Sequence, residues 1–508
     1  MPIMRIFSTL LVLMLANQAY AISEDFTQAT DTNNWVAQDY ACLTAGSNAV
    51  STTSPNYNNA NSNIPGCNYG TPDAPGSGAL RLTPSQNSQH GAIVSSYTMP
   101  TNQGLQVTFT TYTYGGDSGG TAGQGADGIS FFLQDGAVGT AVGGSTNLGS
   151  WGGSLAYSCS NVNSNYTGLT GGYLGLGIDE YGNFLNGGAG NDNTATGILN
   201  TNVSGASTIN GSNTWSSGSN TYQPNRIGLR GAGNVSSYWL NQNYPNLYTS
   251  SNPSTMASAV QNTCKTGLIQ NGGSGTMAYA VSSMSISGTT LTVTTSSTLN
   301  LRVGDTINMY SSSSSYPKAS NGVYIASTTS TTPANDTQYT VTSVNLGANQ
   351  FTVNTTGTGS VSHAGNARFT INTLDYAVIP GGYWVLPNAQ KISNISATTR
   401  SAATPITYKL IITPSGYLTF MYNYNNTGFQ TVLPNPNTPG SLFNILTANG
   451  GSLPGSFRFG FAGSTGGSRN NHDITCFAAQ PLESNSSVGA NTVQTGQLQT
   501  NTQIYLAS

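Results

Sequence analysis

Two short segments constrain the fold of this chain more than any others. Residues 125–133 read Gly-Ala-Asp-Gly-Ile-Ser-Phe-Phe-Leu, and residues 174–184 read Leu-Gly-Leu-Gly-Ile-Asp-Glu-Tyr-Gly-Asn-Phe. Each joins an apolar run of strand length to a polar, glycine-containing loop. The pattern predicts two buried strands whose loops together offer carboxylates, an amide and accessible glycine backbone.

Composition favours an all-β protein. Only 6% of the 508 residues are charged and the net charge is −3, which excludes an electrostatic nucleic-acid binder. A hydrophobic content of 37% with 27 Tyr supports a sizeable core, and the length suggests two or three domains. Low Lys and Glu with abundant Thr, Val, Ile and Tyr favours strands. We expect almost no long helix.

The N-terminus has the features of a signal peptide, which we expect over residues 1–21. Arg5 precedes an apolar run over residues 6–16, and Ala19 and Ala21 supply the small residues of a cleavage site. A membrane anchor is the alternative, but the run is too short to cross a bilayer, and no later segment could. The chain is therefore expected to be secreted, without a membrane span.

Secretion makes disulfides possible among the five cysteines. Cys42 and Cys67 flank one loop-rich stretch and form the first expected pair, and Cys159 with Cys264 forms the second. Cys476 is left over, either buried or paired with sequence beyond the end of this chain.

The pattern of expected strands and loops divides the chain into regions. Alternating strands with Gly/Ser/Asn loops run over residues 22–275 and return over residues 373–483. Between them, residues 276–372 contain short period-two strands typical of a small β-barrel or sandwich, which we interpret as an inserted module. Residues 484–508 are expected to be a linker and the start of a missing C-terminal domain.

The loop after the second apolar run carries a candidate metal site. Asp179, Tyr181 and Asn183 alternate, so an extended backbone can point the carboxylate, the carbonyl and the amide toward one side. Hard oxygen ligands at short spacing suit calcium, and Asp192 is the acid available as a fourth ligand. In the alternative interpretation, Asp179 caps backbone amides in an Asx-rich turn.

Asp127 is open to two interpretations as well. It is either an ordinary turn residue before Gly128 or a carboxylate that accepts hydrogen bonds from sugar hydroxyls. Phe131 and Phe132 face opposite sides of the next strand, and at least one is expected in the core. Trp151, in a glycine-rich loop, is the tryptophan best suited to stack on a sugar.

Four stretches in chain order resemble the landmarks of legume-type (L-type) lectins: residues 125–133, 171–176, 178–183 and 457–466, the last followed by 472–477. The resemblance covers most of residues 22–480 outside the insertion. It implies a concanavalin-like antiparallel β-sandwich, or jelly roll, with a sugar site in loops at one edge. It also implies that Asp127, Gly171 or Gly172, and Asn183 contact the sugar, with calcium holding Asn183 in place.

The chain departs from that lectin pattern at three positions. Gly177 and Arg226 stand where the family has a glutamate and a histidine for a transition metal, so none is expected. A further calcium-binding acid would fall on Gly187, so either Asp192 substitutes through a longer loop or the calcium site is weak or absent. Without calcium, Asn183 loses its support and sugar binding becomes doubtful.

A second resemblance concerns the whole chain. Residues 234–248, 259–266, 379–383 and 500–507 are similar to the N-terminal region of bacterial type IV pilus tip adhesins. This implies a secreted, pilus-associated adhesin fragment that binds a cell-surface or matrix glycan and pilus components.

Two other classes of function remain open. One is a glycoside hydrolase on the same sandwich, since one fold hosts lectins and glycosidases. Its paired carboxylates have little support, because Glu24, Glu180 and Glu483 are the only glutamates and His472 is interpreted as structural. The other is a surface or filament scaffold, or an adhesin that binds protein. We favour the non-catalytic lectin-like adhesin.

Overall fold

The computed structural model describes most of the chain between residues 21 and 482. The described residues are 21–33, 35–47, 64–68, 70–119, 125–138, 148–163, 165–184, 215–217, 220–222, 224–249, 253–271, 277–326, 337–373, 376–387, 389–434, 443–449 and 451–482. Residues 1–20 of the expected signal peptide, Gly187, Asp192 and the tail from residue 483 lie outside them.

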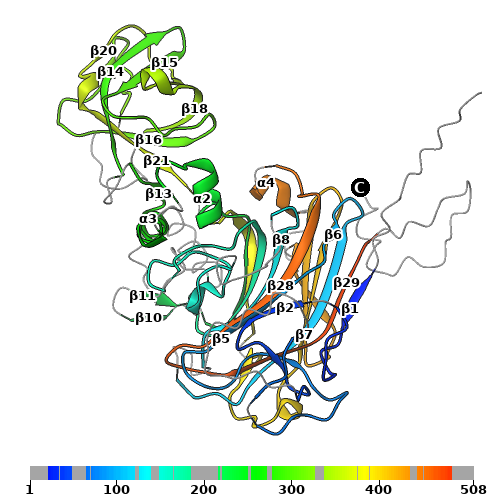
Figure 1. The fold of residues 1–508 in the computed structure, drawn as a ribbon. Coiled ribbons are helices and arrows are strands. Elements are labelled where there is room, and N and C mark those ends of the chain that lie inside the picture. Colours follow the sequence, from blue (N-terminus) through cyan, green and yellow to red (C-terminus); the bar gives the residue numbers. More distant parts are fainter. Residues whose placement is uncertain are drawn as a thin grey trace, which may run out of the picture.

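A ten-stranded sheet forms one layer of a sandwich (Figure 1). Its main path runs β26 (Phe429–Leu433), β25 (Tyr417–Tyr424), β24 (Ile406–Ile412), β7 (Leu105–Tyr114), β29 (Asn471–Gln480), β4 (Leu80–Thr83) and β3 (Cys42–Leu43). Three short strands pair beside this path: β1 (Ile22–Glu24), β23 (Ser393–Asn394) and β27 (Phe443–Asn444). All pairings are antiparallel except β23 with β7.

An eight-stranded antiparallel sheet forms the other layer. Its path is β2 (Trp35–Asp39), β5 (His90–Ser95), β28 (Ser456–Ser464), β8 (Gly128–Asp135), β9 (Gly172–Asp179), β12 (Arg226–Arg230) and β22 (Val378–Val385), with β6 (Met99–Pro100) beside β28. The two segments that open the sequence analysis thus form the neighbouring central strands β8 and β9. A separate hairpin joins β10 (Trp215–Ser217) and β11 (Asn220–Tyr222).

The main core lies between these sheets. Phe109 of β7 packs against Phe131 of β8 and Phe461 of β28, with ring centroids 5.1 and 5.0 Å apart. All three side chains are at most 1% exposed, and each buried aromatic ring of this size contributes about 2 kcal/mol through the area it removes from water. The predicted all-β sandwich is confirmed.

The outer face of the eight-stranded sheet is also covered. Successive side chains of a strand point to opposite faces, so Phe132 points away from Phe131. It is fully buried in a second cluster with Leu155, Tyr157 and Phe184. Residues 148–163 and 165–169, which include the 3₁₀ turn η1 (Gly152–Ser154), therefore pack onto this face and are held close to the ends of β8 and β9.

A smaller β-barrel projects from the sandwich (Figure 1). It closes because β16 (Thr306–Ser311) pairs with both β18 (Thr337–Asn345) and β21 (Ala367–Asn372). The circuit continues through β14 (Tyr279–Ser287), β15 (Thr290–Thr295) and β19 (Gln350–Asn354), while β13 (Leu268–Ile269) adds to β21. The remaining short elements are β17 (Lys318–Ala319), β20 (Val361–Ser362), η4 (Leu346–Ala348) and η5 (Ala364–Asn366).

Short helices occupy the junction between barrel and sandwich. Figure 1 shows α2 (Ser237–Asn243) and α3 (Pro253–Thr266) there, and α4 (Ile445–Asn449) beside the sandwich; η6 (Arg400–Ala402) precedes β24. At 14 residues, α3 is the longest helix in the described chain and the exception to the expected scarcity of helices. No helix among the described residues has both the length and the apolar character needed to cross a bilayer.

Two disulfides join Cys42 to Cys67 and Cys159 to Cys264, the pairs expected from the sequence. The second links α3 to the segment that covers the outer face of the eight-stranded sheet. Cys476 in β29 is free and exposed, so it is not the buried thiol that was one of its two expected fates.

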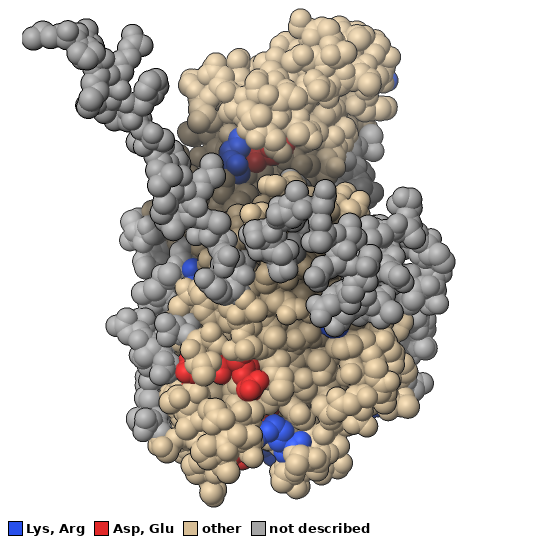
Figure 2. Space-filling view, turned by 90° about the vertical axis from the view of Figure 1, so that its right-hand side faces the viewer, with Lys and Arg blue, Asp and Glu red and all other residues tan. Residues whose placement is uncertain are grey.

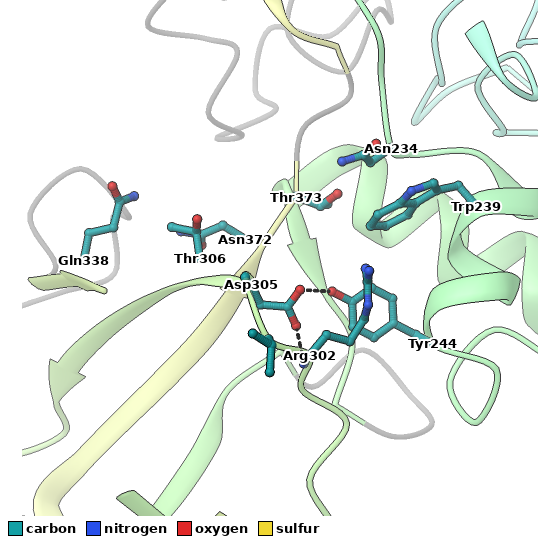
Figure 3. A pocket seen from close by; sticks show the side chains of 11 residues that line it. Asn234, Trp239, Tyr244, Arg302, Asp305, Thr306, Gln338, Asn372 and Thr373 are labelled. Atoms are coloured by element: carbon teal, nitrogen blue, oxygen red, sulfur yellow. Dashed lines mark hydrogen bonds between the residues drawn. The ribbon is translucent and has the colours of Figure 1, made fainter. Parts of the chain in front are cut away.

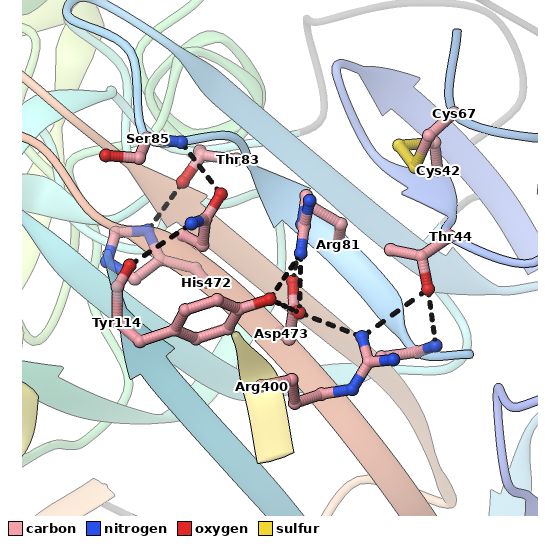
Figure 4. A network of polar contacts seen from close by, with 12 residues as sticks. Cys42, Thr44, Cys67, Arg81, Thr83, Ser85, Tyr114, Arg400, His472 and Asp473 are labelled. Atoms are coloured by element: carbon pink, nitrogen blue, oxygen red, sulfur yellow. Dashed lines mark hydrogen bonds and ion pairs between the residues drawn. A yellow bond between two sulfur atoms is a disulfide. The ribbon is translucent and has the colours of Figure 1, made fainter. Parts of the chain in front are cut away.

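A buried polar network ties the ten-stranded sheet to its loops (Figure 4). The fully buried Asp473 carboxylate accepts hydrogen bonds from Arg81 Nε at 2.7 Å, Tyr114 Oη at 2.9 Å and Arg400 Nη1 at 3.0 Å. Burial alone would raise the pKa of Asp473, but the two guanidinium groups outweigh it and hold the pKa below its ordinary value.

Candidate functional site

The register of β8 with β9 determines which predicted site residues meet. Gly128 pairs with Asp179 at one end of this strand pair, and Gln134 pairs with Gly172 at the other. The backbone carbonyl of Asp127 accepts hydrogen bonds from the N–H groups of Glu180 at 3.2 Å and Tyr181 at 3.3 Å. The loop that ends at Asp127, before β8, and the loop that follows β9 and contains Asn183 are therefore joined through their backbones at one edge of the sheet.

The Asp127 carboxylate is anchored to β28. Its Oδ2 accepts a hydrogen bond from the Ser464 hydroxyl at 3.0 Å, and its backbone N–H donates to the Ser464 carbonyl at 2.7 Å. The peptide bond between Ala126 and Asp127 is cis. Burial raises the pKa of Asp127 to about 6, and the nearby Glu180 adds to the effect.

Asp179 organises the neighbouring loop. Its two carboxylate oxygens accept hydrogen bonds from the backbone N–H groups of Gly182 at 2.7 Å and Phe184 at 2.8 Å. This is the amide-capping arrangement of the alternative interpretation, although each oxygen keeps a second lone pair for another partner. Burial raises the pKa of Asp179 to about 7 despite these amides, and Asp127 and Glu180 contribute further. Three acids are thus buried together.

Glu180 is the third acid, and sequence reasoning gave it no role in the site. Its carboxylate accepts a hydrogen bond from Asn470 Nδ2 at 2.5 Å and contacts His472 Nε2 at 2.8 Å. His472 Nδ1 is 2.6 Å from the Thr83 hydroxyl. Glu180 and His472 have no exposed side-chain surface, which agrees with the structural interpretation of His472.

Asn183 is fully buried at the same edge and faces a glycine pair that sequence reasoning missed. A Cβ added to Gly153 would collide with the Asn183 Cβ, so only glycine allows this approach. The adjacent Gly152 N–H donates to the Ser464 hydroxyl at 2.9 Å. The glycine-rich stretch around Trp151 was the available signal, but we read it only as a candidate stacking loop.

Trp151 does lie beside this cluster. Its half-buried ring stacks on His90, with centroids 4.5 Å apart and an interplanar angle of 17°. His90 Nδ1 in turn lies 3.0 Å from Asp39 Oδ2, which orients the imidazole. The stack forms a partly exposed aromatic wall next to Gly152.

The structure does not bring Gly171 and Gly172, the glycines of the expected sugar-binding set, next to Asp127. Gly172 begins β9 at its opposite end, seven residues from Asp179, which corresponds to about 23 Å along an extended strand, and Gly171 directly precedes it. Gly171 accepts a hydrogen bond from the Asp135 N–H at 2.8 Å, and Gly172 packs against Tyr157. Gly152 and Gly153 provide the glycine backbone at the Asp127 edge instead.

The residues present do not fit the family's transition-metal site. A Cβ added to Gly177 would collide with the Phe184 ring, so an aromatic side chain fills the place from which a glutamate would reach. Arg226, paired with Asp179 in the β-ladder, puts a buried cation where the family has histidine.

For calcium, Asp179, the Tyr181 carbonyl and Asn183 are adjacent at the cluster of buried acids, where a cation would relieve the raised pKa of Asp179. The remaining expected ligand, Asp192, lies outside the described residues. Within the described ranges, no group of three His, Cys, Asp or Glu side chains is placed to hold a metal ion. The available set is therefore one carboxylate with a carbonyl and an amide, which are ligands of calcium type.

Two glycines follow Ser464 close to the Asp127 carboxylate, a side chain that is 7% exposed. A Cβ added to Gly466 would lie 3.6 and 3.7 Å from the two oxygens of the Asp127 carboxylate and would meet nothing else within 4 Å among the described residues. A Cβ on Gly467 would meet nothing within 4 Å. A side chain at residue 466 would therefore lie against the carboxylate, and glycine leaves that side of it uncovered by a side chain of its own.

Comparison with known proteins gives matches at the level of structure. No protein-family model matches the chain, and no curated protein matches it either. The exoplasmic/lumenal domain of VIP36, in its Ca²⁺/Man₃GlcNAc-bound form, is 10% identical, with 88% of this chain and 84% of that chain covered and a TM-score of 0.28. Lectin I-B4 from Griffonia simplicifolia, metal-free, is 9% identical, with 90% and 98% covered and a TM-score of 0.31. The lectin from Bauhinia forficata in complex with GalNAc is 10% identical, with 92% and 100% covered and a TM-score of 0.32.

Proposed function

We propose that this chain is a lectin-like carbohydrate-binding protein whose ligand site is the loop cluster around Asp127. The observation that carries the proposal is that four residues converge at one end of the β8–β9 strand pair: Asp127, Ser464, Gly153 and Asn183. A carboxylate accepts strong hydrogen bonds from sugar hydroxyls, and glycine backbone lets a sugar ring approach closely. Beside them, the Trp151 ring supplies an apolar surface.

Calcium is the cation that best fits the supporting loop. Asp179, the Tyr181 carbonyl and Asn183 would hold it, with Asp192 as a further ligand. A bound cation would offset the charge of the buried acids and fix the orientation of the Asn183 amide. The protein residues then bind the sugar: Asp127 accepts from hydroxyls, and the Gly152–Gly153 segment lines the approach.

The arrangement favours binding over hydrolysis. A retaining glycosidase needs two carboxylates about 5 Å apart across its substrate. Glu180, the nearest glutamate to Asp127 in the chain, is fully buried and engaged by Asn470 and His472, so its oxygens do not face an open surface. We therefore propose a non-catalytic role.

The biological setting that we propose rests on the sequence. The signal-peptide pattern, the two disulfides and the resemblance to pilus tip adhesins support a secreted bacterial adhesin that acts at the cell surface with type IV pilus components. The projecting barrel also suits the alternative of a surface scaffold, because it adds contact area away from the Asp127 site.

A glycan array tests the binding proposal. The purified protein is expected to bind a limited set of glycans, and a calcium chelator is expected to abolish that binding. Failure to bind any glycan in the presence of calcium would favour the scaffold.

A further inference from the structure

A cavity lies between helix α2 and the barrel strands, away from Asp127. Its volume is about 490 Å³, within the usual range for small-molecule sites. Both modules line it (Figure 3): Trp239 and Asn234 stand on the helix side, and Thr306 and Gln338 stand on the barrel side. In the space-filling view, a basic and an acidic patch lie together in the recess below the barrel (Figure 2).

Aromatic side chains form the helix side of this cavity, which we call the junction pocket. The Trp239 ring is half-buried, so part of its surface faces solvent. Its centroid is 5.9 Å from that of the buried Tyr244. Such a ring offers an apolar face to the C–H groups of a sugar. Asn234 adds a half-exposed amide on the same side.

The loop before β16 supplies the charge. The exposed Arg302 guanidinium lies 5.6 Å from the Trp239 ring and 5.7 Å from the Tyr244 ring. Asp305 accepts hydrogen bonds from the Tyr244 hydroxyl at 2.9 Å and from the backbone N–H of Arg302 at 2.7 Å (Figure 3). Each Asp305 oxygen thus accepts one hydrogen bond, and the charges of Asp305 and Arg302 also attract each other. In the described part of the chain, the guanidinium itself forms no ion pair.

Further polar groups complete the junction pocket. Gln338 presents an exposed amide whose Nε2 donates to Asn308 Oδ1 at 3.4 Å, and the neighbouring Val303 is 63% exposed. The Asn372 side-chain oxygen and the Thr373 hydroxyl line the floor, and neither has a hydrogen-bond partner within the described structure although both are buried. Such orphaned groups are rare in native proteins.

We propose that the junction pocket binds an acidic saccharide residue through its carboxylate. Arg302 is the donor, because a guanidinium matches a carboxylate with two parallel hydrogen bonds. The sugar ring then lies against Trp239, and its hydroxyls reach the Asn234 and Gln338 amides. Leu240 and Tyr244 of the helix side pack in the same core as the barrel strands, which holds the two sides of the pocket together. The pocket is independent of the Asp127 site.

Saturation-transfer NMR tests this proposal. The acidic probes are D-glucuronic acid and N-acetylneuraminic acid, and D-glucose is the neutral match that differs from glucuronic acid by one carboxylate. The full chain is used, carrying Asp127→Ala and with chelator present, so that loss of the calcium-dependent site cannot change the result. We expect transfer to at least one acidic probe and little to glucose.

Two variants separate the junction pocket from general charge effects. Arg302→Gln removes an exposed cation and is expected to weaken binding of the acidic probe about tenfold or more, as for loss of a charge-assisted hydrogen bond. Lys391→Gln removes an equally exposed cation on the sandwich and should leave binding unchanged. The proposal is overturned if neither acidic probe binds, if glucose binds equally well, or if Arg302→Gln binds like the parent protein.

Discussion

Glu180 and His472 join the two sheets of the sandwich directly behind the candidate carbohydrate site. Glu180 follows β9 of the eight-stranded sheet, His472 lies in β29 of the ten-stranded sheet, and their side chains are 2.8 Å apart. Both are fully buried, and Asn470 and Thr83 complete the hydrogen bonds around them. The position of the Asp127 loop therefore depends on a polar contact in the core.

Removing Glu180 should destabilise the fold. Glu180→Ala leaves the His472 ring and the Asn470 amide buried without their partner, and we expect a loss of about 3 kcal/mol in the free energy of unfolding. Urea denaturation measures this loss. Asp117→Asn is the control, because Asp117 and Arg469 form a half-exposed pair at 3.8 Å that is expected to contribute less than about 1 kcal/mol. Equal effects of the two substitutions would contradict a stabilising role for the contact between Glu180 and His472.

The titration of Asp473 should lower the free energy of unfolding at low pH. Its pKa is lowered in the folded state, so its contribution is complete above the unfolded pKa of about 3.9 and is lost as the pH falls through the lower folded value. Asp473→Asn is expected to cost about 3 kcal/mol at pH 7. The gap from the parent protein should shrink below pH 4. A gap independent of pH down to pH 2 would rule out this linkage.

Calcium should stabilise the folded protein. A ligand that binds only the folded state adds about 2.7 kcal/mol at a concentration 100 times its Kd. Thermal unfolding with calcium and with chelator measures this difference. Asp179→Asn should abolish most of the calcium response, because it removes the carboxylate of the expected ligand set. Asp73→Asn, at an exposed carboxylate paired with Arg400, should retain the response. If calcium has no effect on the parent protein, the calcium part of the proposal fails.

The glycine approach to Asn183 can be tested by adding one methyl group. Gly153→Ala forces Asn183 to move, because the new Cβ would collide with the Asn183 Cβ. We expect overpacking to cost about 1–3 kcal/mol and glycan binding to weaken strongly. Gly467→Ala, in the neighbouring loop, meets nothing within 4 Å and should fold normally. Unchanged glycan binding by Gly153→Ala would remove Asn183 from the site.

The sequence predicted the strands better than the site. Alternation and apolar runs identified β8, β9 and the barrel strands, because these patterns reflect local burial. The site depends on register, which sequence alone did not supply: it is the pairing of Gly128 with Asp179 that sends Gly172 to the far end of β9. The role of Glu180 could not be predicted because its partner His472 is 292 residues away in the sequence. Ser464 lay within a landmark of the lectin resemblance, but nothing in its spacing linked it to Asp127.

The central claim is that Asp127 contacts the bound glycan, and a titration tests it most directly. Isothermal calorimetry uses the glycan that binds most strongly on the array, in the presence of calcium. It compares the parent protein with Asp127→Asn and with Asp117→Asn, a half-exposed control. We predict that Asp127→Asn weakens binding about tenfold or more while Asp117→Asn does not, because only Asp127 supplies a charged acceptor to the sugar. Equal affinity of Asp127→Asn and the parent protein would contradict the site.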